Sequence, residues 1–187
     1  MASIGHLAVG AAIGAVYSKQ AGTRPRVTIL TFAALALAPD LDLLTNSLGA
    51  IPNTPFSHRG ITHSIIFALF VALVAGALVR GTTRRQLLTG LWVFAALGSH
   101  GLLDTMSRLG NGPMLFWPLT HAQYEFPWRP IPGVLTAEYY LTREAIPTLV
   151  VETMLFFPFI AYALTFFLPR PIARGANRGE VGQSAGG

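Results

Sequence analysis

Cysteine is absent from the 187-residue chain, and charged residues are scarce. Without a thiol the chain cannot form disulfide bonds, thiolate metal sites or a cysteine nucleophile. Charged residues make up 11% of the sequence and hydrophobic residues 52%, whereas a typical soluble domain has about 25% charged residues. A surface with so little charge cannot face water on all sides. The composition therefore excludes an ordinary soluble domain and indicates a polytopic membrane protein.

Five apolar segments predict an all-α fold, a membrane helix bundle of about four to five transmembrane helices. The segments cover residues 4–18, 27–48, 61–79, 86–106 and 145–168. A span needs roughly 20 residues, so the third, fourth and fifth segments are long enough and the first is short. The second reaches spanning length only if it continues past Pro39, which would kink or break a helix.

The net charge of +5 does not indicate nucleic-acid binding, because the basic residues form no single patch. They lie in small groups between apolar segments, as topology signals do. The positive-inside rule places the groups of alternate connections in the cytoplasm and the N-terminus outside. We therefore expect a multi-pass protein of the inner (plasma) membrane, with membrane lipids as partners. The three groups are Lys19, Arg24 and Arg26, then Arg80, Arg84 and Arg85, then Arg170, Arg174 and Arg178.

Three short motifs next to the apolar segments contain all of the aspartates and most of the histidines. They are Pro39-Asp40-Leu41-Asp42, His58-Arg59-Gly60-Ile61-Thr62-His63-Ser64 and His100-Gly101-Leu102-Leu103-Asp104. Ionisable groups are costly in a membrane and usually functional there. Imidazole and carboxylate together bind zinc, manganese or iron. The candidate metal ligands are His6, Asp40, Asp42, His58, His63, His100 and Asp104.

On the predicted topology all of these candidate ligands lie near the non-cytoplasmic face of the membrane. They exceed the three ligands that one catalytic zinc needs. We therefore expect one or two divalent ions, and two ions would be bridged by Asp40 or Asp42. A lone histidine such as His6 is also often just a satisfied polar group near a helix start.

The residue spacing within two of the motifs predicts different backbone conformations, one a regular helix and the other irregular. His100 and Asp104 are four residues apart, so they share one helix face and could bind one metal, or Asp104 could orient His100. They could equally be a buried hydrogen-bonded pair. Asp40 and Asp42 are two apart and face one site only if the helix is irregular, for which Pro39 provides a reason. Alternatively, Asp40 caps a helix that continues to Leu48.

Catalytic roles are predicted for Arg59, Asp40 and Thr62. Arg59 is a fixed cation that would suit a phosphate or carboxylate group and the charge that develops on it. A topology or lipid-headgroup role explains Arg59 equally well. Thr62 could cap the third helix or hydrogen-bond a metal ligand. Glu152, inside the last apolar segment, is a further candidate for a supporting role.

The connection from residue 107 to residue 143 is rich in proline, glycine and aromatic residues. We expect it to form a lid over the site in the interfacial zone, where amphipathic rings are favoured. Residues 1–168 would form one membrane-embedded domain, followed by a basic, glycine-rich and disordered tail over residues 169–187. The aromatic residues of the predicted lid are Trp117, Tyr124, Trp128, Tyr139 and Tyr140.

The order of these motifs resembles the YdjM-type family. The resemblance includes His6, the three motifs and the stretch from Gly112 to Trp117-Pro118-Leu119, and it extends over roughly residues 1 to 168. Members of this group are described as predicted inner-membrane, metal-dependent hydrolases, also labelled LexA-binding and formerly a domain of unknown function. The resemblance implies a bacterial or archaeal membrane hydrolase.

The leading hypothesis is a metal-dependent hydrolase at the outer membrane surface that acts on a phosphoester or lipid-linked substrate. A second hypothesis is a non-catalytic metal-binding transporter or sensor, since polar residues in membrane helices often mark ion paths. Residues 67–79 and 91–97 offer no polar side chain that would continue such a path. A third, a membrane anchor for a cytoplasmic regulator, depends only on the family label.

Overall fold

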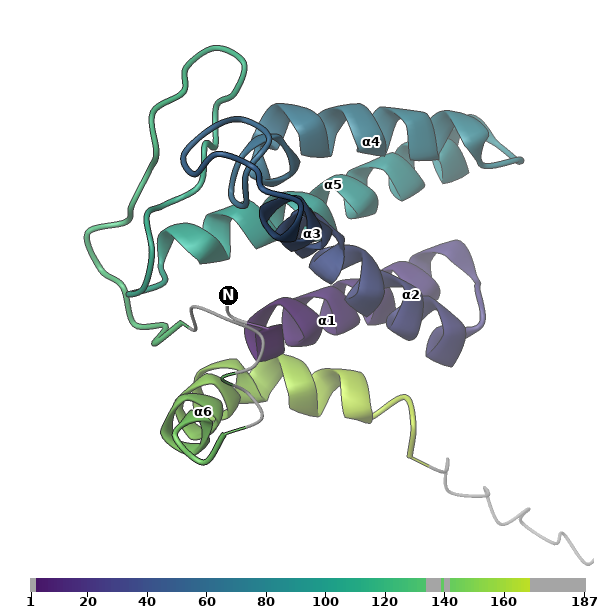
Figure 1. Ribbon diagram of the computed structural model, residues 1–187. Helices are drawn as coiled ribbons and strands as arrows, with labels where there is room; N and C mark the ends of the chain where they lie inside the picture. Colours follow the sequence, from purple (N-terminus) through teal and green to yellow (C-terminus); the bar gives the residue numbers. More distant parts are fainter. Residues whose placement is uncertain (1–2, 134–138, 140–141, 169–187) are drawn as a thin grey trace, which may run out of the picture.

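The computed structural model describes residues 3–133, 139 and 142–168, and these fold as a helical bundle (Figure 1). Within them the structure contains no sheet, and an isolated β-bridge joins Ser107 to Ile131. The all-α prediction is therefore confirmed over these residues. The elements are α1 (Ser3–Ala21), α2 (Pro25–Leu37), the 3-10 turn η1 (Ala38–Asp42), α3 (Leu43–Ser47), the 3-10 turn η2 (Ile61–His63), α4 (Ile65–Leu78), α5 (Thr83–Thr105) and α6 (Ala145–Leu164).

Three helical stretches among the described residues are long and apolar enough to cross a membrane. They are Pro25–Thr45, Thr83–Thr105 and Ala145–Leu164. The prediction of four to five transmembrane helices is thus only partly confirmed. α1 has 19 residues but does not meet the same criterion of apolarity. α4 has 14 residues, or about 21 Å of helix, which is short of a hydrocarbon core of about 30 Å.

The third apolar segment was predicted to be a span, but its regular helix begins later than predicted and is shorter than a span requires. Ser64 is the N-cap of α4, and its side chain accepts a hydrogen bond from Phe67 N. The preceding residues Ile61–His63 form η2 instead. Thr62 therefore does not cap this helix.

The second apolar segment continues past Pro39, as spanning the membrane requires. α2 ends at Leu37, and the chain passes through η1 into α3 without leaving helical geometry. Pro39 lies in the first turn of η1. Proline has no N–H to donate to an α-helical hydrogen bond, so a tighter 3-10 turn replaces the α-helix at Pro39.

α1 lies in the centre and packs against α2, α5 and α6, while α4 packs against α5 (Figure 1). Two glycines bring α1 close to α2. A Cβ at Gly10 would lie 2.6 Å from the Phe32 carbonyl oxygen, and one at Gly14 would lie 2.8 Å from that of Thr28. Small residues allow membrane helices to approach in this way.

The two helix pairs place their short connections at one end of the molecule. The α1–α2 and α4–α5 turns point the same way, and the long loop between α5 and α6 lies at the other end (Figure 1). Lys19, Arg24, Arg80 and Arg84 belong to these turns or the residues beside them. This arrangement agrees with the predicted alternation, in which every second connection between apolar segments is basic and lies on one side of the membrane. The orientation itself stays a prediction.

Candidate metal centre

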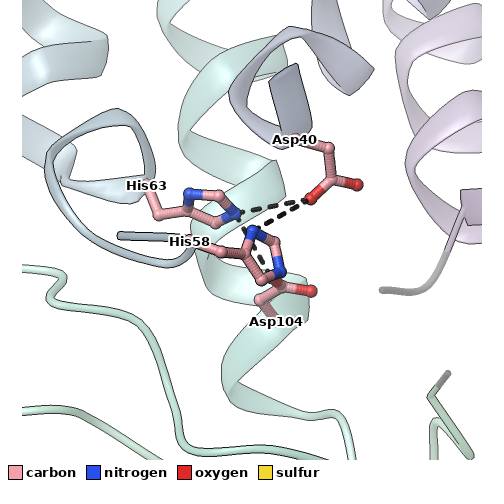
Figure 2. A group of neighbouring side chains, drawn as sticks. All are labelled: Asp40, His58, His63 and Asp104. Atoms are coloured by element: carbon pink, nitrogen blue, oxygen red, sulfur yellow. Dashed lines mark ion pairs between the residues drawn. The ribbon is translucent and has the colours of Figure 1, made fainter. Parts of the chain in front are cut away.

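The candidate ligands come from separate elements and meet in the interior of the bundle. His6 is in the first turn of α1, Asp40 and Asp42 are in η1, and His100 and Asp104 are in the last turns of α5. His58 precedes η2, and His63 is its last residue. All are buried except His58, which is partly exposed. Figure 2 shows Asp40, His58, His63 and Asp104 pointing toward one another. The predicted convergence is therefore present in the structure.

His63 lies at the middle of the group. Its Nε2 is 3.6 Å from Asp40 Oδ1 and 3.4 Å from Asp104 Oδ2. Burial by itself lowers the pKa of His63, but the carboxylates of Asp104, Asp40 and Asp42 outweigh burial and hold this pKa well above its ordinary value. The negative potential that retains a proton there would equally attract a metal cation.

His63 and His100 present their Nε2 atoms to the centre because their Nδ1 atoms are bonded elsewhere. His100 Nδ1 is 2.7 Å from the Ala36 carbonyl oxygen, which can only accept, so Nδ1 carries the proton. Nδ1 of His58 and of His63 lie 2.7 Å and 3.1 Å from Asp42. Metal-binding histidines usually have this outer hydrogen bond, which fixes the ring and leaves the other nitrogen for the metal.

Asp42 makes its contacts on the outer side of these rings. Besides the two imidazoles, its Oδ2 accepts hydrogen bonds from Thr62 Oγ1 at 2.6 Å and from the Arg59 backbone N–H at 3.3 Å. The carboxylate thus holds His58 and His63 in place. The 3-10 turn allows Asp40 and Asp42 to reach the same centre although they are two residues apart, which a regular helix would prevent.

Several buried polar atoms at the centre have no hydrogen-bond partner in the described part of the chain. These are both ring nitrogens of His6 and both carboxylate oxygens of Asp40 and of Asp104. Buried carboxylate oxygens that accept no hydrogen bond are disfavoured, even beside a cationic side chain. Bound divalent cations would satisfy the carboxylate oxygens and one ring nitrogen of His6, so the residues fit a metal site.

The donor atoms form two groups that share one residue. Asp40, His58, His63 and Asp104 each offer a ligand atom within 4.8 Å of the others, and so do His6, Asp40 and His100. The ring of His6 is stacked on that of His100 with centroids 3.8 Å apart, and its Nε2 is 3.4 Å from Asp104. Nitrogen and oxygen donors of this kind suit zinc, manganese or iron.

Arg59 connects the centre to the long loop. Its Nε is 3.2 Å from Asp104 Oδ2, and its Nη1 donates to the carbonyl oxygens of Leu109 and Asn111. Its backbone φ is 68°, a left-handed conformation that non-glycine residues seldom adopt. Within the described residues, no hydrogen-bond partner is present for its Nη2. The guanidinium therefore keeps one donor group free beside a candidate metal ligand.

The loop predicted to be a lid is joined by backbone hydrogen bonds to the segment from Arg59 to Ile65, which contains His63. Met114 N donates to the Arg59 carbonyl and Ile65 N donates to that of Leu115, both at 2.9 Å. Trp128 in the same loop is largely exposed. Tyr140 of the predicted aromatic set and the predicted tail, residues 169–187, lie outside the described residues.

Residues 1–171 match the family described as YdjM inner membrane protein. This chain belongs to that family. It is also similar to the inner membrane protein YbcI of Escherichia coli (strain K12), with 35% identity over 122 residues, which cover 63% of this chain and 68% of YbcI. No solved structure matches the chain. The family resemblance inferred from the motifs is thus confirmed, together with the inner-membrane location.

Proposed function

We propose that this YdjM-family protein is a membrane-bound, metal-dependent hydrolase of phosphoesters. The observation that carries the proposal is the set of buried carboxylate oxygens of Asp40 and Asp104 that accept no hydrogen bond within the described residues and face the imidazoles of His6, His63 and His100. Such an arrangement has a high cost in the absence of a cation and little use as a structural core. Intramembrane ionisable groups of this kind commonly mark a functional site.

Two ions would use all of the candidate ligands except Asp42. One would be held by Asp40, His58, His63 and Asp104, and the other by His6, Asp40 and His100, with Asp40 common to both groups. Bound divalent ions activate water for attack and act as Lewis acids on a phosphoryl oxygen. The chain itself contributes the buried carboxylates and the outer hydrogen bonds that orient the rings of His58, His63 and His100.

The neighbouring polar side chains divide into two roles. Arg59 would bind the anionic group of the substrate through Nη2, because Asp104 and the loop carbonyls fix the rest of its guanidinium. Arginine in a water-poor site stabilises charge that develops on a phosphoryl group. Thr62 would act as a positioning residue, since its hydroxyl is donated to Asp42.

An amphiphilic substrate, such as a lipid-linked phosphate, is favoured by the apolar surface beside the centre. Leu41, between the two aspartates, is 67% exposed, and Phe56, two residues before His58, is 73% exposed. Side chains of this kind are compatible with lipid and unfavourable in water. We therefore propose that the phosphate of the substrate reaches the centre while its apolar part stays in the membrane.

The test compares the wild-type protein with Asp40→Asn and with His121→Ala, a substitution of an exposed histidine in the loop. Each purified protein is analysed for bound metal and assayed on a panel of phosphoesters and phospholipids, with and without chelator. We expect two ions per chain and chelator-sensitive turnover for wild type and His121→Ala. Asp40→Asn should lose most metal and at least about 100-fold in rate, because both groups share this carboxylate.

Two results would overturn the proposal. One is a wild-type protein that takes up no divalent metal. The other is full metal loading without turnover on any member of the panel, together with metal uptake into sealed vesicles, which would favour a transporter instead.

A further inference from the structure

Glu152 is a buried carboxylate that the proposed chemistry does not use. It lies in the membrane-spanning helix α6 and is 0% exposed. Its Oε2 accepts a hydrogen bond from the backbone N–H of Ile4, at 3.2 Å, in the first turn of α1. Among the described residues, Oε1 has no hydrogen-bond partner. A carboxylate is rarely kept inside a membrane helix without a function.

The first turn of α1 carries His6, whose ring is stacked on His100 and lies 3.4 Å from Asp104 but makes no hydrogen bond within the described residues. Neither of its nitrogens is hydrogen-bonded, although the residue is fully buried. Its place opposite His100 and Asp104 therefore also depends on where α1 begins and how α1 is rotated. A shift of about 1 Å along the axis would alter the ligand geometry that metals require.

A second contact from α6 acts on the same turn. Phe156 lies four residues after Glu152, and therefore on the same face of α6. A Cβ on Gly5 would lie 2.5 Å from the Phe156 ring, so α1 and α6 touch directly at this glycine. Glu152 thus bonds the backbone just before Gly5, and Phe156 packs against Gly5 itself. Together they fix the turn both along its axis and in its distance from α6.

We propose that Glu152 is the positioning residue for His6, and so for the ion held by His6, Asp40 and His100. The N–H groups of a first helical turn have no partner within the helix and attract negative charge. The Glu152 carboxylate supplies the acceptor inside the membrane, where water is absent. This inference rests on the proposed metal centre, but it concerns only the His6 half of that centre.

The experiment uses the full-length protein and two variants that break the contact from opposite sides. Glu152→Ala removes the acceptor, and Ile4→Pro removes the donor at a helical position where proline is tolerated. Thr148→Ala is the matched control, because Thr148 is buried on the same face of α6 one turn earlier. Glu152→Gln keeps a carbonyl acceptor of nearly the same shape.

Two readouts are measured on each variant. The first is metal bound per chain, which should fall from two to one in Glu152→Ala and Ile4→Pro and stay at two in Thr148→Ala and Glu152→Gln. The second is the rate at which diethyl pyrocarbonate modifies His6 in metal-free protein, followed by peptide mass spectrometry. This rate should rise about 10-fold or more in the same two variants, since a displaced imidazole becomes accessible.

The outcomes separate this inference from the proposed function. A wild-type protein without metal would contradict the metal centre, whereas the His6 modification rates would still report on positioning. Retention of two ions and of a protected His6 in Ile4→Pro would overturn the role of Glu152, even if Glu152→Ala failed to fold.

Discussion

At the scale of single residues, the hydrogen bonds around Asp42 decide how well the centre is formed. Asp42 contacts His58 through Oδ1, and it contacts His63 and the hydroxyl of Thr62 through Oδ2. Outer partners of this kind usually contribute 10- to 100-fold to metal affinity. Thr62 is therefore expected to affect metal binding without itself holding the metal.

We predict that Thr62→Val weakens metal binding by about 10-fold while the protein stays folded. Valine keeps the shape of threonine but cannot donate to Asp42, which leaves the carboxylate free to turn away from His58 and His63. The measurement is a titration of metal-free protein with zinc or manganese. Thr105→Val is the control, because that hydroxyl bonds its own helix at Leu102. Equal affinities of Thr62→Val and wild type would contradict the role given to Thr62.

The sequence predicted which residues meet but not what each one does. Ionisable groups in apolar surroundings identified the ligands, because each is costly there unless it has a partner. The role of Asp42 depends on which side of the imidazoles its oxygens lie, and residue spacing does not contain that information. The contact between Glu152 and Ile4 joins residues 148 positions apart. Only the charge of Glu152 in an apolar segment was visible beforehand.

At the scale of elements, a glycine in α5 allows this helix to pack closely against η2, the turn that ends at His63. A Cβ at Gly101 would lie 2.3 Å from the backbone carbonyl oxygen of His63 and 3.1 Å from a methyl group of Leu115. A backbone carbonyl cannot move aside for an added Cβ as the end of a flexible side chain can. The glycine between His100 and Asp104 thus lets the helix carry two ligands within reach of a third.

We predict that Gly101→Ala lowers metal content to one ion or fewer and destabilises the fold by about 1–3 kcal/mol, as overpacking does. The added methyl group must push α5 and the His63 turn apart. Gly98→Ala, one turn earlier, is the matched control: its Cβ would meet nothing closer than 4.0 Å. That change should keep both ions and stabilise the helix by up to about 1 kcal/mol. Thermal unfolding and metal analysis of both variants provide the test, and similar behaviour of the two would contradict it.

The boundaries of helices and turns were predictable where a residue imposes a particular backbone conformation, and they were less predictable elsewhere. Pro39 indicated the irregular turn in the second apolar segment, and η1 is found there. The start of α4 was placed too early because Ile61 begins an apolar run. Serine immediately before an apolar stretch is an N-cap signal, and Ser64 would have placed the start correctly.

At the scale of the whole molecule, two features distinguish one end of the protein from the other. The short connections with their basic residues lie at one end, and the start of α1 and the end of α5, which carry His6, His100 and Asp104, lie toward the long loop (Figure 1). Positively charged connections remain on the cytoplasmic side during insertion. The centre is therefore expected to open toward the non-cytoplasmic side, where it would meet lipid-linked substrates of the outer leaflet.

Labelling of single cysteines can decide this orientation, because the natural chain has none. Leu119→Cys places a thiol in the long loop at a position that is 80% exposed, and Thr83→Cys places one at the exposed start of α5, beside Arg84 and Arg85. We predict that a membrane-impermeant maleimide labels Leu119→Cys in intact spheroplasts and labels Thr83→Cys only after permeabilisation. The reverse pattern would put the metal centre at the cytoplasmic face. Its substrates would then be phosphoesters of the inner leaflet, although the ligand geometry would be unchanged.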